Sequence, residues 1–430
     1  MSELYLEQDF QFLDIDDENI KPFADKNGTM IRRRSSVRSK FNIQPLAEHS
    51  QSYTFDNDYA VSEDEEEYTE EQSEKGKPVK GKTDLRNRKL SDFDELRILG
   101  IGSYGRVHLV KDRFNSRLYA KKTIKKAKLS VDETSLKNSR NERDILAKIS
   151  HPAIVKLFYA FHDEEDINFI LEYIPGGEIF YHLNSKKRFS ETDSAFYLAE
   201  ISEALHHLHT TAGVVYRDLK PENVMLNSKG HVVLTDFGLS SMEEKCKSLL
   251  GTPQFTAPEV LSGGSYSYPA DWWSFGIMMF DMITGDPPFK SGNKQKLFEK
   301  IIKSKITYPF YLSTDCKDLL MRLLNKNPEK RLPIDKDYEQ FKRHRFFRKV
   351  DWKSLRSTAP PFLPNCSDLE NPVNFDFDYI DEELRSKNSI LNGAIPIPIS
   401  QQQSDENSHT GSLFKGFSFV ASSSLLESQF

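Results

Sequence analysis

Cysteine is scarce in this chain. Only three occur in 430 residues, Cys246, Cys316 and Cys366. They are odd in number and far apart, so they can build neither a disulfide framework nor a C-x-x-C zinc pair. This scarcity indicates a reducing compartment, and we expect the three thiols to be ordinary small side chains.

Long apolar runs are missing as well. The most apolar stretch, residues 272–283, is too short to cross a bilayer and contains Asp281. The acidic N-terminus, MSELYLEQDF, lacks the apolar region of a signal peptide. We therefore expect a soluble intracellular protein with no membrane span, located in the cytoplasm, with a nuclear share left open.

The chain has no excess of positive charge. Its 59 basic and 65 acidic residues give a formal net charge of −6, whereas nucleic-acid-binding domains are usually basic. This argues against a general nucleic-acid binder. Hydrophobic residues make up 37% and charged residues 29%, so a globular core can form, but not along the whole chain.

Residues 1–92 have the composition of a disordered regulatory arm. They contain a basic cluster at 31–40 and an acidic run at 62–75, without sustained periodicity. Such segments cannot bury enough apolar surface to offset the entropy of ordering. The serines of Arg33-Arg34-Ser35-Ser36 could be autophosphorylated or act as a pseudosubstrate, and the cluster could equally be a nuclear-localisation signal or a solvated patch.

The apolar pattern changes after residue 92. Residues 93–174 hold short apolar runs at strand spacing around one helix candidate. Residues 175–347 show helical spacing, and 271–284 is apolar nearly all round, as in a helix buried within a lobe. Residues 348–430 are rich in Pro, Ser and Asn. We expect an α+β, bilobal fold with a small antiparallel-sheet lobe, a larger and mostly helical lobe, and an extended C-terminal tail.

Glycines open the first of these lobes. Gly100, Gly102 and Gly105, followed by Val107, form a G-x-G-x-x-G-x-V pattern. In a dinucleotide-binding fold a helix must follow such glycines. Here a strand, a turn and a second strand follow, so we predict a hairpin whose backbone N–H groups can lie over phosphates.

A lysine and a glutamate stand at matching positions further along. Lys122 lies in a predicted strand in an A-x-K pattern, and Glu142 lies twenty residues later on the predicted helix. An ion pair between them would make the position of the lysine depend on that of the helix.

The segment Tyr-Arg-Asp-Leu-Lys-Pro-Glu-Asn carries the strongest local signal. Asp218 can orient a hydroxyl and accept its proton, and Lys220 can neutralise charge on a transferred phosphoryl group. Asn223 and the Asp236 of Asp-Phe-Gly offer the hard oxygen ligands that Mg²⁺ prefers. Ala-Pro-Glu follows at 257–259, with Arg331 as the expected ion-pair partner of its glutamate.

These motifs, in this order, resemble the eukaryotic protein kinases over residues 93–347. DLKPEN and Gly251-Thr252-Pro253 resemble the serine/threonine-specific branch. GGEIF, DWWSFG and the tail motif at 414–419 resemble the AGC group, and within it the ribosomal S-six kinases. The resemblance implies an ATP- and Mg²⁺-dependent phosphotransferase, a kinase with Asp218 and Lys220 as catalytic residues and Asn223 and Asp236 as metal ligands. The implied ATP-binding residues are Gly100, Ile101, Gly102, Ser103, Tyr104, Gly105, Val107, Ala120, Lys122, Glu142, Glu172 and Ile174.

The chain departs from this pattern in a few places. Tyr216 replaces the histidine usual before Arg-Asp, a change common in the group. Leu250 and the segment 254–256 differ where the substrate residue after the acceptor would dock, which leaves fine specificity open. The motifs occur once in these residues, so we expect no second kinase domain.

The resemblance also implies regulatory sites. Ser248 matches the activation-loop phosphosite, with Arg217 as the expected partner of its phosphate. Phe414, Phe417 and Phe419 are expected to dock on the small lobe beside the Glu142 helix, more firmly when Ser418 is phosphorylated. The alternatives are an exposed serine in a flexible loop and an aromatic cluster in a disordered tail. Ser400 is suggested as a turn-motif site by spacing alone.

Three acids match positions that bind substrate arginines in basophilic relatives: Glu178, Glu222 and Asp281. Each could equally be a solvated acid, but together they predict arginine at minus three, and at minus two, of protein substrates. We expect upstream activating kinases as partners and a monomer.

The alternatives to an active kinase are a pseudokinase scaffold and a small-molecule phosphotransferase. The first would lack Lys122, Asp218 or Asp236, and the second would lack Ala-Pro-Glu. We expect surface or packing roles for the histidines at 206, 207 and 209, because the sequence places no Cys or acid around them in the pattern of a metal site.

Overall fold

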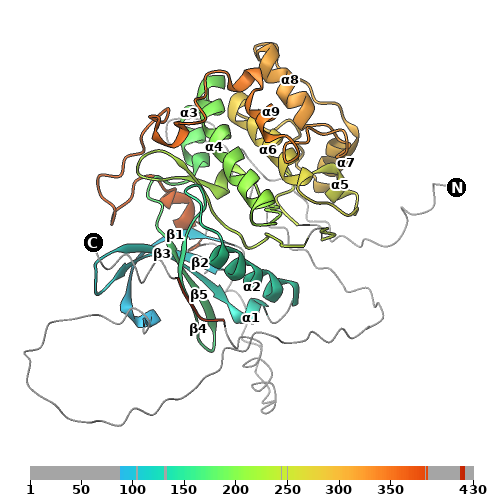
Figure 1. Cartoon of the computed structure of the whole chain (residues 1–430). Coiled ribbons are helices and arrows are strands. Elements are labelled where there is room, and N and C mark those ends of the chain that lie inside the picture. The colour runs from blue at the N-terminus through green and yellow to red at the C-terminus, as the bar shows by residue number, and fades with distance from the viewer. Residues whose placement is uncertain are drawn as a thin grey trace, which may run out of the picture.

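The computed structural model describes residues 88–102, 105–129, 133–243, 245–248, 250–382, 384–385 and 417–421. Several predicted features lie outside these residues: both charged clusters of the N-terminal arm, Ser103, Tyr104, Ser400 and Phe414. The described chain forms a sheet lobe and a helical lobe, as the sequence predicts (Figure 1).

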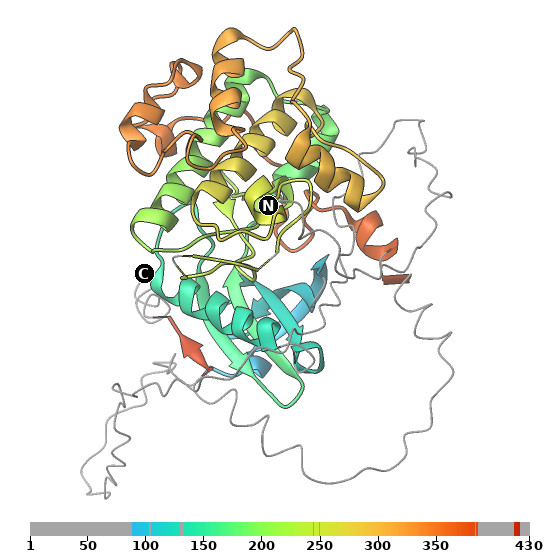
Figure 2. The same ribbon diagram turned by 90° about the vertical axis from the view of Figure 1, so that its right-hand side faces the viewer.

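The small lobe is built on an antiparallel sheet in the order β1-β2-β3-β5-β4-β8. Its last strand comes from the far end of the chain and pairs with the edge of β4 (Figure 2). The elements are β1 Phe93–Ile101, β2 Gly105–Asp112, β3 Leu118–Lys125, α1 Lys126–Leu129, α2 Glu133–Lys148, β4 Leu157–His162, β5 Asp166–Glu172 and β8 Phe419–Val420, after a short 3-10 helix, η2, at Leu90–Asp92.

The glycine motif forms the predicted hairpin between β1 and β2. Gly105 leaves no room for a side chain, since an added Cβ would lie 1.6 Å from the carbonyl oxygen of Thr123 on β3. The N–H of Gly102 donates to the carbonyl of Gly105 at 2.9 Å. A strand rather than a helix follows the glycines, which excludes the dinucleotide-binding interpretation.

The large lobe is helical. Ser190 caps α4 by accepting from the N–H of Asp193, and α6 is buried from Ala270 to Ile283, as its all-round apolarity predicts. None of the helices in the described ranges is long and apolar enough to cross a membrane. The helices are α3 Ile179–Lys186, α4 Glu191–Thr210, α5 Pro258–Leu261, α6 Pro269–Thr284, α7 Lys294–Lys303, α8 Thr314–Leu323 and α9 Tyr338–Lys342, with 3-10 turns η3 Pro221–Asn223, η4 Arg345–Phe347 and η5 Leu355–Ser357.

A two-stranded sheet lies where the lobes meet. It consists of β6 Val224–Leu226 and β7 Val232–Leu234. The Leu234 N–H donates to the carbonyl of Ala153, and the Val155 N–H donates to that of Leu234, at 2.8 and 3.0 Å. These bonds join the segment before β4 to the large lobe.

A buried ion pair fixes the Ala-Pro-Glu segment. Arg331, whose side chain is 1% exposed, donates to both carboxylate oxygens of Glu259 at 2.6 and 2.8 Å. The predicted pair is therefore confirmed. It anchors α5 to the base of the large lobe, since the same guanidinium donates to the carbonyl of Pro269 at the start of α6.

Candidate active site

Lys122 lies between two carboxylates in the cleft between the lobes. Its ammonium donates to Glu142 Oε1 on α2 at 2.6 Å and to Asp236 Oδ1, just after β7, at 2.7 Å. The pair with Glu142, predicted from spacing, is confirmed. One cation thus joins β3, α2 and the large lobe.

The charges of Lys122, Glu142 and Asp236 shift one another's pKa values. Burial opposes the charged form of Lys122, but Asp236 and Glu142 outweigh it and hold the lysine pKa above its usual value. The lysine charge lowers the pKa of Asp236, whose side chain is half exposed, to about 2. Burial raises the pKa of Glu142, an effect that Lys122 opposes. Asp236 therefore stays ionised at neutral pH.

A second cluster surrounds Asp218. Lys220 donates to Asp218 Oδ2 at 2.7 Å and to the Thr252 hydroxyl at 3.0 Å. That hydroxyl donates to Asp218 Oδ1 at 3.0 Å. The Asn223 amide donates to Asp218 Oδ2 at 2.9 Å. Both Asp218 oxygens are therefore oriented. Thr252 ties the segment between Asp236 and Glu259, the activation segment, to residues 216–223, the catalytic loop.

Burial raises the pKa of Asp218, and the Lys220 charge partly offsets this rise. A carboxylate of raised pKa accepts a proton more readily than an exposed one. Burial also opposes the charge of Lys220, but Asp218 outweighs it and raises the lysine pKa. Asp218 therefore has the properties of a general base, and Lys220 is a cation fixed beside it.

A family model described as a protein kinase domain matches residues 93–347. The chain belongs to the protein kinase family. It is 39% identical to the serine/threonine-protein kinase YPK3 of Saccharomyces cerevisiae, over 80% of this chain and 77% of that protein. It is 40% identical to a RAC family serine/threonine-protein kinase homolog of Dictyostelium discoideum, over 78% and 73%. It is 42% identical to human ribosomal protein S6 kinase alpha-3, over 79% of this chain but 45% of that protein.

These similarities identify an AGC-group serine/threonine kinase close to the ribosomal S6 kinase subfamily, as the sequence motifs indicate. It is an ATP-dependent enzyme of the kinase fold. Protein kinases in general use ATP with Mg²⁺ and act on proteins.

An apolar cluster of the small lobe includes a residue of the C-terminal tail whose packing role the sequence analysis missed. Phe375 of the C-terminal tail is buried in one cluster with Leu99. Val107 and Ala120, both predicted to bind ATP, pack against that cluster, and so does Met225 of β6. The tail therefore packs beside residues that are predicted to bind ATP. The signal in the sequence was Phe375 and Phe377 alternating with acids in NFDFD.

The tail is held at the connection between the lobes by close backbone approach. A Cβ on Gly176 would lie 2.8 Å from Pro364 Cγ, and one on Gly177 would lie 1.9 Å from the Asn374 carbonyl oxygen. The Asn374 amide donates to the carbonyl of Pro175 at 3.0 Å. Residues 176–178 thus contact the tail and lead directly into α3.

Ser248 lies beside the arginine that the sequence analysis named. The Arg217 guanidinium donates to the exposed Ser248 hydroxyl at 3.3 Å and to the Ser240 carbonyl at 3.4 Å. The Tyr266 hydroxyl donates to the Ser248 carbonyl at 2.7 Å. The serine is therefore held close to a cation of the catalytic loop.

Phe417 lies in the small lobe, 1% exposed. Its ring meets Phe169 of β5 at 5.8 Å between centroids, and the Arg143 guanidinium of α2 lies 5.2 Å from the ring centre. The β8 pairing and a bond from the Ala421 N–H to the Phe158 carbonyl hold the segment. This is docking beside the Glu142 helix, as expected, and Ser418 is exposed there.

The three predicted substrate-binding acids differ in burial. Glu178 precedes α3 and Glu222 lies in η3, which packs against α3, and both are partly exposed. Asp281 is 2% exposed within α6. Glu178 and Glu222 are thus the accessible members of the set, and arginine binding by all three stays a prediction.

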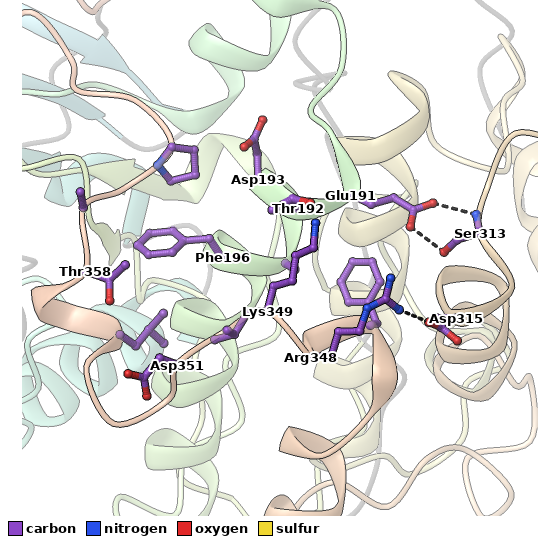
Figure 3. A pocket seen from close by; sticks show the side chains of 16 residues that line it. Glu191, Thr192, Asp193, Phe196, Ser313, Asp315, Arg348, Lys349, Asp351 and Thr358 are labelled. Atoms are coloured by element: carbon purple, nitrogen blue, oxygen red, sulfur yellow. Dashed lines mark hydrogen bonds and ion pairs between the residues drawn. The ribbon is translucent and has the colours of Figure 1, made fainter.

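A cavity of about 280 Å³ lies elsewhere on the large lobe, between the start of α4 and the segment 346–361 (Figure 3). The polar side chains that line it bond to one another: Ser313 donates to Glu191, and Arg348 forms an ion pair with Asp315. None of the predicted catalytic or ATP-binding residues lines it. It is separate from the catalytic cleft.

The packing of Phe375 beside the predicted ATP-binding residues leads to a prediction. Phe375→Ala should raise the KM for ATP about tenfold with little change in kcat, because loss of a buried ring removes about 1.5–3 kcal/mol of apolar contact. Initial rates at varied ATP measure this. Leu363→Ala, a 70% exposed residue of the same tail, is the control. An unchanged KM in a variant that melts like the parent would contradict the tail's part in nucleotide binding.

Proposed function

We propose that this kinase transfers the γ-phosphate of ATP to serine or threonine through Asp218, Lys220 and Lys122. Asp218 orients the substrate hydroxyl and accepts its proton. Lys220 stabilises the charge that develops on the phosphoryl group, and Lys122 holds the α- and β-phosphates. The observation that carries the proposal is the joint placement of Lys122 between Glu142 and Asp236, and of Asp218 between Lys220 and Thr252.

The donor set fits a magnesium ion. Asn223 uses its amide nitrogen on Asp218, which leaves its side-chain oxygen as the atom that can ligate a cation. Asp236 bonds Lys122 through Oδ1 and has Oδ2 for the same purpose. Oxygen ligands of this kind suit Mg²⁺, which when bound neutralises phosphate charge.

The same proposal includes basophilic specificity. Glu178 and Glu222 lie on elements in contact, α3 and η3, and Glu222 is next to the metal-ligand candidate Asn223. Two partly exposed acids at this place favour arginine upstream of the acceptor. Asp281 would contribute its charge from a buried position.

Two serine peptides test the chemistry and the specificity together. One carries arginine at minus three and minus two, and the other carries alanine there. We expect transfer to the arginine peptide alone, loss of transfer in Asp218→Ala, and a KM for that peptide about tenfold higher in Glu178→Gln or Glu222→Gln. Glu299→Gln on α7 is the matched control. Equal transfer to both peptides would refute the specificity, and no transfer at all would favour a scaffold.

We also propose that phosphorylation of Ser248 activates the enzyme. The Arg217 guanidinium already lies at 3.3 Å from the hydroxyl, and a phosphate adds about −1.5 to −2 charge for it to bind. Because Arg217 precedes Asp218 and also donates to the Ser240 carbonyl, this pairing would fix the catalytic loop and the activation segment together.

Ser248→Ala should lower kcat about tenfold in protein phosphorylated by its upstream kinase, since a charge-assisted pair worth about 1.5–3 kcal/mol is lost. Rates of peptide phosphorylation, with mass-spectrometric mapping of Ser248, measure this. Ser265→Ala, an exposed serine outside the pairing, should behave as the parent. Full activity in Ser248→Ala would rule out the switch.

The docked tail supports a second phosphorylation-dependent step. Phe417 is buried against β5 and α2, while the neighbouring Ser418 is exposed to a modifying kinase. We propose that phosphate on Ser418 strengthens this docking and so holds α2 in place.

A further inference from the structure

A buried histidine lies behind the catalytic loop, in contact with two carboxylates. His209, in the last turn of α4, is 3% exposed. Its Nε2 lies 2.9 Å from Asp271 Oδ2 on α6. Its Nδ1 lies 3.0 and 3.2 Å from the two oxygens of Asp335, in the loop before α9.

This geometry determines the charge of the ring. A neutral imidazole has one N–H and one lone pair, whereas here both nitrogens face carboxylate oxygens and both must donate. Burial lowers the pKa of His209, but Asp271 and Asp335 outweigh it and raise the pKa to about 9. The pKa of Asp335 is lowered, because bonds and charge from His209 outweigh the effect of burial.

The first carboxylate holds the catalytic loop. Asp271 Oδ2 accepts from the Tyr216 N–H at 2.8 Å, and Oδ1 accepts from the Arg217 N–H at 2.7 Å. Arg217 has φ +70°, a left-handed conformation that costs an arginine free energy and that its surroundings must enforce. The residue after it is Asp218. Asp271 therefore holds the backbone that leads directly into Asp218.

The second carboxylate is fixed in turn. The Trp272 indole N–H donates to Asp335 Oδ2 at 2.7 Å, and the Tyr268 ring stacks on His209 at 4.6 Å between centroids. The other titratable group close by is His206, whose Nδ1 lies 3.6 Å from Asp335 Oδ1. Burial lowers its pKa, an effect that Asp335 opposes and that the charges of His209 and Lys342 reinforce, so His206 is neutral where His209 titrates.

We propose that His209 is a positioning residue held as an imidazolium by Asp335, and that in this state it orients Asp271 and thereby the catalytic loop. The proposal rests on the assignment of Asp218 as the base. It gives Asp335, 117 positions along the chain from Asp218, a part in phosphate transfer without contact with the substrate.

The pH dependence follows from the direction of the shift. A histidine whose pKa is raised from 6.5 to about 9 adds stability that is complete below pH 6.5 and is lost as pH rises through about 9. Removing the Asp335 charge lowers the pKa of His209. The imidazolium, and with it the support of the catalytic loop, is then lost at a pH where the parent keeps both.

NMR of the full chain with ¹⁵N-labelled histidine tests the charge state directly. We expect both ring nitrogens of His209 to be protonated at pH 7.5, with the signal assigned by its loss in His209→Gln. An unprotonated ring nitrogen at that pH would overturn the proposal, whether or not the protein is active, so this result does not depend on the role of Asp218.

The kinetic test uses Asp335→Asn, which keeps the size of the side chain. We expect its single-turnover transfer rate to fall about tenfold between pH 6.5 and 8.5 relative to the parent, with an unchanged KM for ATP, because a small displacement of the base is costly. Asp337→Asn, in the same loop but exposed and with a side chain that caps α9, should follow the parent. A pH–rate profile of Asp335→Asn identical to the parent's would overturn the proposal, and melting curves identify variants that fail to fold.

Discussion

The contact between Lys122 and Glu142 is the constraint on which the rest of the active arrangement depends. The two residues belong to different elements, β3 and α2, and their ion pair of 2.6 Å exists only when the helix lies against the sheet. Lys122 simultaneously bonds Asp236 from the large lobe. A buried lysine without these partners would carry an uncompensated charge. The helix, the sheet and the metal-ligand candidate are therefore coupled through one ammonium group.

Contacts outside the cleft maintain this arrangement. Arg143, the neighbour of Glu142 on α2, lies over the ring of Phe417, which comes from near the end of the chain. On the opposite side, Asp271 holds the backbone of Tyr216 and Arg217, and Thr252 links Asp218 to the activation segment. The tail also packs, through Phe375, beside residues that are predicted to bind ATP. The C-terminal segment thus contacts both α2 and the residues that are predicted to bind ATP.

Motifs with fixed chemistry could be predicted from the sequence. Gly105, Lys122, Asp218 and Asp236 were identified because glycine, lysine and carboxylate at these spacings suit phosphate transfer, and the fold followed from a change of apolar period near residue 175. Residues whose role depends on distant packing could not be found this way. Phe375 meets Val107 only through the fold, and His209 could be interpreted only as a packing residue, because its carboxylate partners lie 62 and 126 positions away in the chain.

A double-mutant cycle tests the central claim that tail docking acts through the Lys122–Glu142 pair. Single-turnover transfer rates are measured for the parent, Phe417→Ala, Glu142→Gln and the double variant. If Phe417 serves to hold Glu142 on Lys122, its replacement should slow the parent about tenfold and the Glu142→Gln protein less than about twofold, because the interaction is already lost. Equal factors in both backgrounds would show that the tail and the ion pair act independently and would contradict the account.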